Sequence, residues 1–276
     1  MQSRLSLLVL FALATTSVDG RADPPELIEQ WVIGGFDAPE GVAYGNNRIY
    51  ISNVNGPGSD KDGNGYVSVL STNGEVIERR LVTGLDAPKG MVLVDDRLYI
   101  ADIDRVHIAN ALSGEVETSL SVEGARFLND VVLWNDTVYV SDSATSTIFA
   151  VTDEGVSPWK TGDFLDGVNG LTAFGDRLLV STMSSGSLYT LDDDDGLNEI
   201  ANGMVNADGI GVADEHGGYL VSSWPGQIWF VDESGETTEL LNTEDEGVYQ
   251  NDLTYVEDML IVPNWNPGTV TMWRLR

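Results

Sequence analysis

Six polar residues recur along the chain within one repeated phrase, and five of them carry oxygen donors. They are Glu40, Lys89, Asn129, Asn169, Asp208 and Asn251. Carboxylate and amide oxygens without histidine or cysteine suit a hard cation such as Ca²⁺, whereas zinc prefers nitrogen and sulfur. If the positions converge, the pattern predicts a metal site formed by Glu40, Asn129, Asn169, Asp208 and Asn251. The alternative is a polar plug, in which the same groups bond to one another and to water.

Lys89 occupies the same repeat position and should bring a positive charge toward the same centre. Three arrangements are open. Lys89 can turn away to form a salt bridge with a neighbour such as Asp102 or Asp130, which is the arrangement that we expect. It can be neutral beside a cation and act as a base. Its ammonium group can also replace the metal.

The repeated phrase indicates which elements position these residues. Its copies are PEGVAY at 39–44, PKGMVL at 88–93, LNDVVL at 128–133, VNGLTA at 168–173, ADGIGV at 207–212 and QNDLTY at 250–255. A period of roughly forty residues is typical of propeller blades. Alternating segments such as RIYIS and TVYVS predict strands that are joined by short polar turns. We therefore predict an all-β fold, a six-bladed β-propeller that forms a single domain over residues 23–276.

The N-terminal segment should close this propeller. The last blade has only three strands before the chain reaches Arg276. WVIGGFDAPEGV at 31–42 is similar to RLVTGLDAPKGM at 80–91, so residues 28–33 resemble an outer strand without a blade of its own. We expect this strand to join the C-terminal blade, because an open propeller would leave unpaired strand edges.

A second polar position recurs where each second strand ends. Its members are Asn53, Asp102, Asp142, Thr182, Ser223 and Asn264. The loops that follow should surround the ring, so we expect Asp102, Asp142, Met183, Trp224 and Trp265 to contact a substrate. The alternative for the two tryptophans is that they cap the core between neighbouring blades. Arg126 could orient an acidic substrate, or form a salt bridge on an acidic surface.

The segment SDKDGNGYVS at 59–68 is a second candidate for calcium binding. Asp60, Asp62 and Asn64 alternate as at the start of an EF-hand loop, with the Tyr66 carbonyl and the Ser68 hydroxyl as further donors. The glutamate that an EF-hand needs at its twelfth position is missing, and a strand should follow in place of a helix. The alternative is a polar turn without metal.

Composition narrows the classes of partner and the location. The chain has 44 Asp and Glu residues against 14 Lys and Arg residues, which argues against binding to nucleic acid or anionic lipid. Residues 1–22 resemble a secretory signal peptide, and no later stretch predicts membrane insertion. There is no cysteine. We expect an exported monomer, in the bacterial periplasm or outside the cell, that acts on a small-molecule substrate. The placement of His107 and His216 predicts no Ser-His-Asp arrangement.

These motifs together resemble the SMP-30/gluconolactonase/LRE-like family, six-bladed lactonases related to the paraoxonases. The strongest parts are RFLNDVVLWNDTVYVSD at 126–142, VNGL at 168–171, ADGI at 207–210 and EGV at 40–42. The resemblance implies a catalytic calcium or other divalent ion held by Glu40, Asn129, Asn169 and Asp208. It also points to Asp208 as the general base. Asn251 is included among the predicted ligands only because it occupies the same position in the repeat.

The resemblance implies metal-dependent hydrolysis of lactones or related esters, with Asp208, or a neutral Lys89, taking a proton from water. Two positions depart from the paraoxonase pattern. Lys89 stands where those enzymes have a catalytic histidine, and Gly41 stands where they have an acid for a second, structural calcium. The alternative function is a non-catalytic secreted propeller, whose ring only plugs the tunnel and whose face binds a ligand or protein partner.

Overall fold

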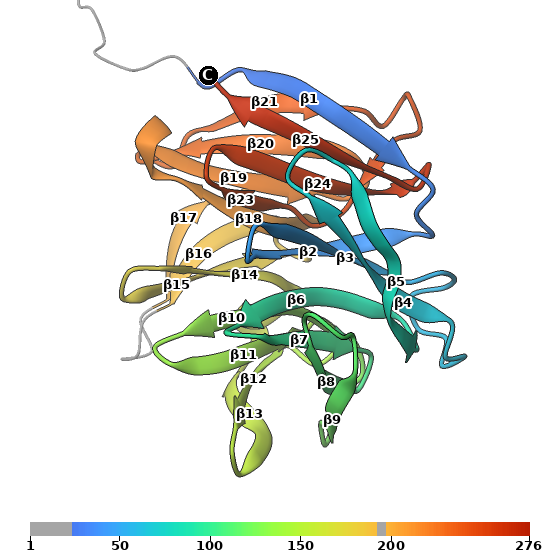
Figure 1. The fold of residues 1–276 in the computed structure, drawn as a ribbon. Coiled ribbons are helices and arrows are strands. Elements are labelled where there is room, and N and C mark those ends of the chain that lie inside the picture. Colours follow the sequence, from blue (N-terminus) through green and yellow to red (C-terminus); the bar gives the residue numbers. More distant parts are fainter. Residues whose placement is uncertain (1–23, 192–196) are drawn as a thin grey trace, which may run out of the picture.

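Antiparallel strands form six sheets, which are the six blades of a β-propeller (Figure 1). The computed structural model describes residues 24–191 and 197–276, so the expected signal peptide at 1–22 lies outside the described residues. The predicted all-β, six-bladed fold is confirmed. Short two-residue turns join the inner strands, as at Asn46 and Asn47, where φ angles of 52° and 56° match the twist of a tight hairpin.

Each of the first three blades has four strands, which run in chain order from the inside of the ring outward. Blade 1 contains β2 (Pro39–Gly45), β3 (Arg48–Asn53), β4 (Gly65–Ser71) and β5 (Val76–Leu85). Blade 2 contains β6 (Pro88–Val94), β7 (Arg97–Asp102), β8 (Arg105–Asn110) and β9 (Val116–Ser121). Blade 3 contains β10 (Leu128–Trp134), β11 (Thr137–Asp142), β12 (Thr147–Thr152) and β13 (Gly155–Thr161).

Blades 4 and 5 repeat this order, and each has one short 3₁₀ turn beside it. Blade 4 follows η1 (Asp163–Leu165) and contains β14 (Val168–Phe174), β15 (Arg177–Thr182), β16 (Ser187–Leu191) and β17 (Leu197–Ala201). Blade 5 contains β18 (Ala207–Ala213), η2 (Asp214–His216), β19 (Gly218–Ser223), β20 (Gln227–Asp232) and β21 (Thr237–Asn242).

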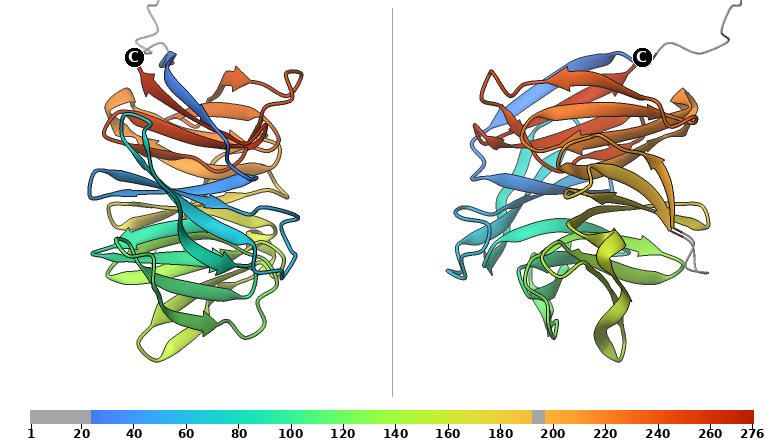
Figure 2. Two further views of the ribbon diagram at one scale, coloured as in Figure 1. Left: turned by 45° about the vertical axis from the view of Figure 1, so that its right-hand side comes forward. Right: turned by 180° about the vertical axis from the view of Figure 1, so that it is seen from behind.

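Blade 6 combines the two ends of the described chain. It contains β22 (Tyr249–Gln250), β23 (Thr254–Val256), β24 (Met259–Asn266) and β25 (Thr269–Leu275), with β1 (Leu27–Gly34) as its outer strand. Strand β1 lies antiparallel to β25, with Trp31 opposite Met272 (Figures 1 and 2). The predicted closure by an N-terminal outer strand is therefore confirmed.

The hydrophobic core lies between the blades. Tyr50 of blade 1 and Ile100 of blade 2, for example, are fully buried in one cluster, and a similar cluster occupies each of the other five junctions between neighbouring blades. Such packing fixes the blades around a common centre, where the inner strands β2, β6, β10, β14 and β18 meet. No helix among the described residues is long and apolar enough to cross a membrane.

Candidate active site

Beta-bulges position the ring residues near the start of the inner strands. In blade 1, Glu40 and Gly41 of β2 together face the single residue Ser52 of β3. Equivalent irregularities lie between Pro88 and Met91, Leu128 and Val131, Val168 and Leu171, and Ala207 and Ile210. A bulge breaks the regular alternation of a strand and re-aims a side chain, so these positions can turn toward the centre of the ring.

Buried serines bind the backbone groups that the bulges release. The Gly170 N–H donates to Ser181 Oγ at 2.8 Å, and the Ser181 hydroxyl donates to the carbonyl oxygen of Asp208 in the next blade. Ser141 makes the same link, accepting from the Asp130 N–H at 2.9 Å and donating to the Asn169 carbonyl at 2.6 Å. Our sequence reasoning missed these serines, although a serine directly before the strand-end polar residue recurs at Ser52, Ser141, Ser181 and Ser222.

A cavity of about 270 Å³ brings the ring residues together. Its lining includes Glu40, Lys89, Asn129, Asn169, Asp208 and Asn251. Three residues expected to contact a substrate, Met183, Trp224 and Trp265, also line it. Trp224 meets Trp265 edge to face, with ring centroids 6.1 Å apart, so the two side chains form one aromatic wall. Gly58 and Phe127 complete the lining, and our sequence reasoning identified neither.

Two oxygen atoms in this ring lack partners. Glu40 Oε2 and Asn169 Oδ1 are buried without a hydrogen bond, although a buried polar atom is almost always paired. Asn129 donates to Ser143 Oγ at 3.2 Å, a bond that uses its amide nitrogen and leaves its oxygen for another partner. These unpaired oxygens oppose the expectation of a polar plug, in which the groups would bond to one another.

Four carboxyl groups near the ring interact electrostatically. Glu40 and Asp208 line this cavity, whereas the half-buried Asp130 and the buried Asp252 line a second cavity of about 210 Å³. Burial, followed by repulsion from Asp208, raises the pKa of Glu40 well above its usual value. Burial and then repulsion from Asp130 raise the pKa of Asp208 to about 7. Asp130 and Asp252, each next to a ring residue, also have pKa values raised chiefly by burial. Our sequence reasoning named Asp130 only as a possible partner of Lys89 and gave Asp252 no role, although both stand where other blades have glycine.

The carboxylate and amide oxygens fit a hard cation better than zinc. Among residues 24–191 and 197–276, no three His, Cys, Asp or Glu side chains gather at metal-binding distance. A cation at this ring would therefore depend on amide oxygens beside Glu40 and Asp208, a donor set that Ca²⁺ accepts. The unpaired oxygens and the excess of buried carboxyl groups both favour such an ion.

Lys89 lines the cavity, and backbone carbonyls hold its ammonium group. Its Nζ donates to the carbonyl oxygens of Gly58 and Ala87, at 2.9 and 3.0 Å, and lies 4.3 Å from the centroid of the Phe127 ring. The expected salt bridge to Asp102 or Asp130 is absent from the described part of the chain. Burial lowers the pKa of Lys89, while attraction from Glu40 opposes that shift.

The strand-end residues Asp102 and Asp142 do not reach the cavity, contrary to our expectation. Asp142 is buried and accepts hydrogen bonds from the backbone N–H groups of Arg126 and Phe127, at 2.6 and 3.2 Å. It also accepts the N–H groups of Ala144 and Thr145, both at 3.0 Å. Its carboxylate therefore fixes the loop before the ring residue Asn129. The Arg126 side chain is exposed and does not line the cavity, so the structure does not place it against a substrate.

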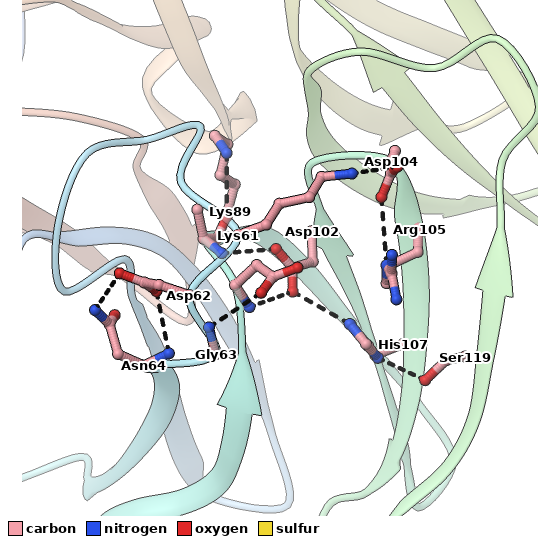
Figure 3. Close-up of polar contacts among 12 residues, drawn as sticks. Lys61, Asp62, Gly63, Asn64, Lys89, Asp102, Asp104, Arg105, His107 and Ser119 are labelled. Carbon is pink, nitrogen blue, oxygen red and sulfur yellow. Dashed lines mark hydrogen bonds and ion pairs between the residues drawn. The ribbon is translucent and has the colours of Figure 1, made fainter.

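Asp102 takes part in a hydrogen-bond chain that our sequence reasoning excluded. Asp102 contacts His107 Nε2 at 3.2 Å, and His107 Nδ1 contacts Ser119 Oγ at 2.8 Å (Figure 3). The cross-strand pairing of His107 with Ser119 explains the contact. Burial raises the pKa of Asp102, but hydrogen bonds from His107 and from the N–H groups of Ala87 and Asp86 hold it below its ordinary value.

This Ser-His-Asp chain lies outside the candidate active site. None of its three residues lines the cavity, and Ser119 is exposed on the outer strand β9. Asp102 uses both carboxylate oxygens to accept backbone N–H groups, of Asp86 and Ala87, each at 2.7 Å. This hydrogen-bond chain therefore holds the turn before Lys89 in place.

The proposed second calcium loop is only partly assembled. Asp62 accepts the backbone and side-chain N–H groups of Asn64, at 3.2 and 2.6 Å (Figure 3). Ser68 already donates to the Arg79 carbonyl at 2.7 Å and lies inside the sheet. The Tyr66 carbonyl belongs to strand β4, paired with β3, and Asp60 is exposed. Asn64 Oδ1 is buried without a hydrogen-bond partner, so one predicted donor has a free oxygen, and the calcium loop stays a prediction.

The comparisons identify the fold more clearly than the function. Neither a protein-family model nor a curated protein matches this chain. Among solved structures, a gluconolactonase from Xanthomonas campestris is similar over 92% of this chain and 96% of its own, with a TM-score of 0.68 and 16% identity. Virginiamycin B lyase from Staphylococcus aureus is similar over 91% of this chain and 100% of its own, with a TM-score of 0.66 and 10% identity.

A third similar structure is a catalytically inactive variant of the Staphylococcus aureus lyase, with histidine replaced by alanine, together with quinupristin. It is 12% identical and covers 91% of this chain and 99% of its own, with a TM-score of 0.62. The resemblance to SMP-30/gluconolactonase-like propellers is thus confirmed in the fold, which gluconolactonases share with virginiamycin B lyases.

Proposed function

We propose that this protein is a divalent-cation-dependent hydrolase of lactones or related esters. The single observation that carries the proposal is the pair of unpartnered oxygens, Glu40 Oε2 and Asn169 Oδ1, beside the cavity. Leaving such groups unpaired costs stability unless a ligand completes them. A cation bound by Glu40, Asn129, Asn169, Asp208 and Asn251 would satisfy them, and Ca²⁺ is the ion that this donor set suits best.

The charge balance supports a bound cation. Repulsion from Asp208 and Asp130 adds to burial in raising the pKa values of Glu40 and Asp252, and Lys89 is the one positive side chain that lowers the pKa of Glu40. A divalent ion would offset this excess of negative charge. A cation-free ring must instead protonate some of these groups, because isolated buried carboxylates are costly.

The residues of the cavity account for the steps of ester hydrolysis. When bound, the cation supplies Lewis-acid stabilisation of the charge that develops on the carbonyl oxygen. Asp208 accepts a proton from water as the water oxygen attacks the carbonyl carbon. The bond between that carbon and the oxygen of the lactone ring then breaks. The leaving oxygen takes up a proton, which gives a hydroxy acid. Trp224 and Trp265 hold the apolar part of the substrate.

The positions of the two histidines favour hydrolysis over a lyase reaction. The Staphylococcus aureus lyase variant described as catalytically inactive has lost one histidine. In this chain, His107 belongs to the hydrogen-bond chain with Asp102, and His216 lies in η2, so neither lines the cavity. No histidine is therefore available at the ring to remove a proton from carbon.

Metal analysis and a lactone panel test the proposal. Purified protein should contain about one tightly held divalent ion per chain, and its hydrolysis of at least one lactone should disappear after treatment with a chelator. Activity should return when Ca²⁺ is restored. Full hydrolysis in the chelated protein would refute the role of the cation. If no cation binds and no lactone or ester is opened, the chain is a binding propeller and the hydrolase proposal is wrong.

A further inference from the structure

Lys89 is the buried charged residue of the cavity that the proposed mechanism does not use. Its side chain is nearly inaccessible, which is rare for lysine, and its Nζ donates to two backbone carbonyls, those of Gly58 and Ala87. The third side of the ammonium group faces the Phe127 ring at 4.3 Å. Such an arrangement uses lysine as a clamp, in which a cation holds carbonyl dipoles and an aromatic face together.

One of the clamped groups belongs to a segment that forms a wall of the cavity. We call residues 54–64, which connect β3 to β4, the strap. Gly58 of the strap lines the cavity and packs toward Phe127, since a Cβ built at Gly58 would lie 3.6 Å from that ring. Lys89 therefore joins the strap of blade 1 to the loop that precedes blade 3.

The strap has further attachments. Its first two residues, Val54 and Asn55, donate backbone N–H groups to the carbonyls of Ala38 and Asp37, at 3.1 and 2.9 Å. Lys61 forms an ion pair with Asp104 of blade 2, and the Gly63 N–H donates to Asp86 Oδ1 at 3.1 Å (Figure 3). The side chains of Lys61 and Asp104 are 45% and 32% exposed, so water weakens their attraction. Of these attachments, only that of Lys89 is made by a residue that lines the cavity.

The charge of Lys89 also acts on the ring. Lys89 and Glu40 occupy the same bulge position of the neighbouring inner strands β6 and β2, and both line the cavity. A positive charge that attracts Glu40 must also repel a second positive charge held by Glu40. Lys89 therefore stabilises the strap but weakens the binding of a divalent cation.

We propose that Lys89 is a positioning residue that fixes the strap as a wall of the substrate cavity and that lowers the affinity of the ring for its divalent cation. The inference rests on the proposed function, because it concerns the same cavity. It assigns Lys89 neither proton transfer nor replacement of the metal. Lys89 thus sets how tightly the cation is held and how large a group the strap side admits.

The test uses Lys89→Met, which keeps all but the last atom of the side chain's length and removes its charge, with Lys89→Arg and Lys61→Met as controls. Calcium affinity is measured by calorimetric titration, strap motion by hydrogen exchange over residues 54–64, and hydrolysis by kcat and KM. Lys89→Met should bind Ca²⁺ about tenfold more tightly, exchange faster in the strap, and raise KM several-fold with kcat changed less than about threefold.

The controls separate the two effects of Lys89. Lys61→Met should loosen the strap while Ca²⁺ affinity stays at the parent value, because Lys61 lies away from the ring. Lys89→Arg should keep the parent affinity because it keeps the charge. If Lys89→Met does not fold, Lys89→Gln serves in its place, with the same expectations.

Several results would overturn the inference. One is a fall in kcat of about a hundredfold or more with KM unchanged, which would make Lys89 a proton-transfer residue. Another is a Ca²⁺ affinity of Lys89→Met that equals or falls below that of the parent, and a third is an unchanged strap. All three leave the hydrolase proposal standing. In contrast, a parent protein that binds no divalent cation and opens no lactone refutes the proposed function itself.

Discussion

Two sets of polar residues recur once in every blade, and they differ in how they are satisfied. The strand-end carboxylates Asp102 and Asp142 are buried and accept backbone N–H groups. The ring residues Glu40 and Asn169 are equally buried, yet each has an oxygen without a partner. The strand-end set is not uniform, since Ser223 Oγ also lacks a partner. Periodicity thus locates buried polar residues, whereas an unpaired oxygen that also lines a cavity, as in Glu40 and Asn169, marks the candidate ligand site.

Replacing Asp208 should produce the largest functional effect and little loss of stability. Asp208→Ala removes an oxygen donor and the proposed base, so kcat/KM should fall about a thousandfold or more. The cation-free variant should be at least as stable as the cation-free parent, because one member of a group of repelling carboxyl groups is gone. Chemical denaturation with and without Ca²⁺, together with lactone kinetics, measures both. Retained activity would remove Asp208 from the site.

Replacing Asp142 should give the opposite result. Asp142→Ala leaves four buried or half-buried backbone N–H groups without their acceptor, which should lower the free energy of unfolding by about 3 kcal/mol. Activity per folded molecule should fall far less than in Asp208→Ala. Denaturant titration checks the first expectation, with the exposed Asp153→Ala as the control. A stable Asp142→Ala protein without activity would reverse the comparison.

Ser181 should show an intermediate effect, because it belongs to neither set but links two blades. Ser181→Ala leaves the Gly170 N–H without its acceptor and frees the carbonyl of Asp208. We expect a loss of about 1–2 kcal/mol in stability and a fall in kcat of about tenfold as Asp208 shifts. Ser222→Ala is the matched control, since the structure shows Ser222 Oγ accepting the Gly209 N–H without a link to the next blade. Equal kinetics in the two variants would count against a positioning role for Ser181.

Ser119 should show the smallest effect. Although Ser119 completes a Ser-His-Asp chain, it is exposed and lies away from the cavity. Ser119→Ala should change the free energy of unfolding by no more than about 0.5 kcal/mol and leave lactone hydrolysis unaltered. Loss of hydrolysis in this variant would move the catalytic centre to the outer strands and remove the basis of the comparison.

The sequence predicted the fold well because every blade of a propeller repeats one sequence pattern. Six copies of one phrase, with Glu40 and Asp208 at the same place in two of them, were enough to predict the blades and their convergence. The pairing of β1 with β25 followed from the similarity of residues 31–42 to residues 80–91. Hydrophobic alternation, turn residues and repeat length all pointed to one architecture, which makes such a prediction dependable.

The details of the site could not be predicted, because they depend on contacts between blades. Asp102 and Asp142 have the residue type and the repeated position expected of site residues. Their partners, however, include backbone groups that no sequence pattern reveals. Lys89 was expected to form a salt bridge, yet it binds carbonyls that are brought to it by the strap and by its own blade. His107 meets Ser119 through strand pairing across a hairpin, which requires the register of β8 against β9.

The pairing of β1 with β25 has a consequence for how the molecule comes into being. Strand β1 must wait for β25, since Trp31 finds its partner Met272 only after the intervening blades have been made. Until then, Trp265 of the final blade cannot join Glu40 of the first around one cavity. A chain that stops before β25 therefore leaves β1 unpaired and the circle of blades open, and the cavity is complete only when the two ends meet.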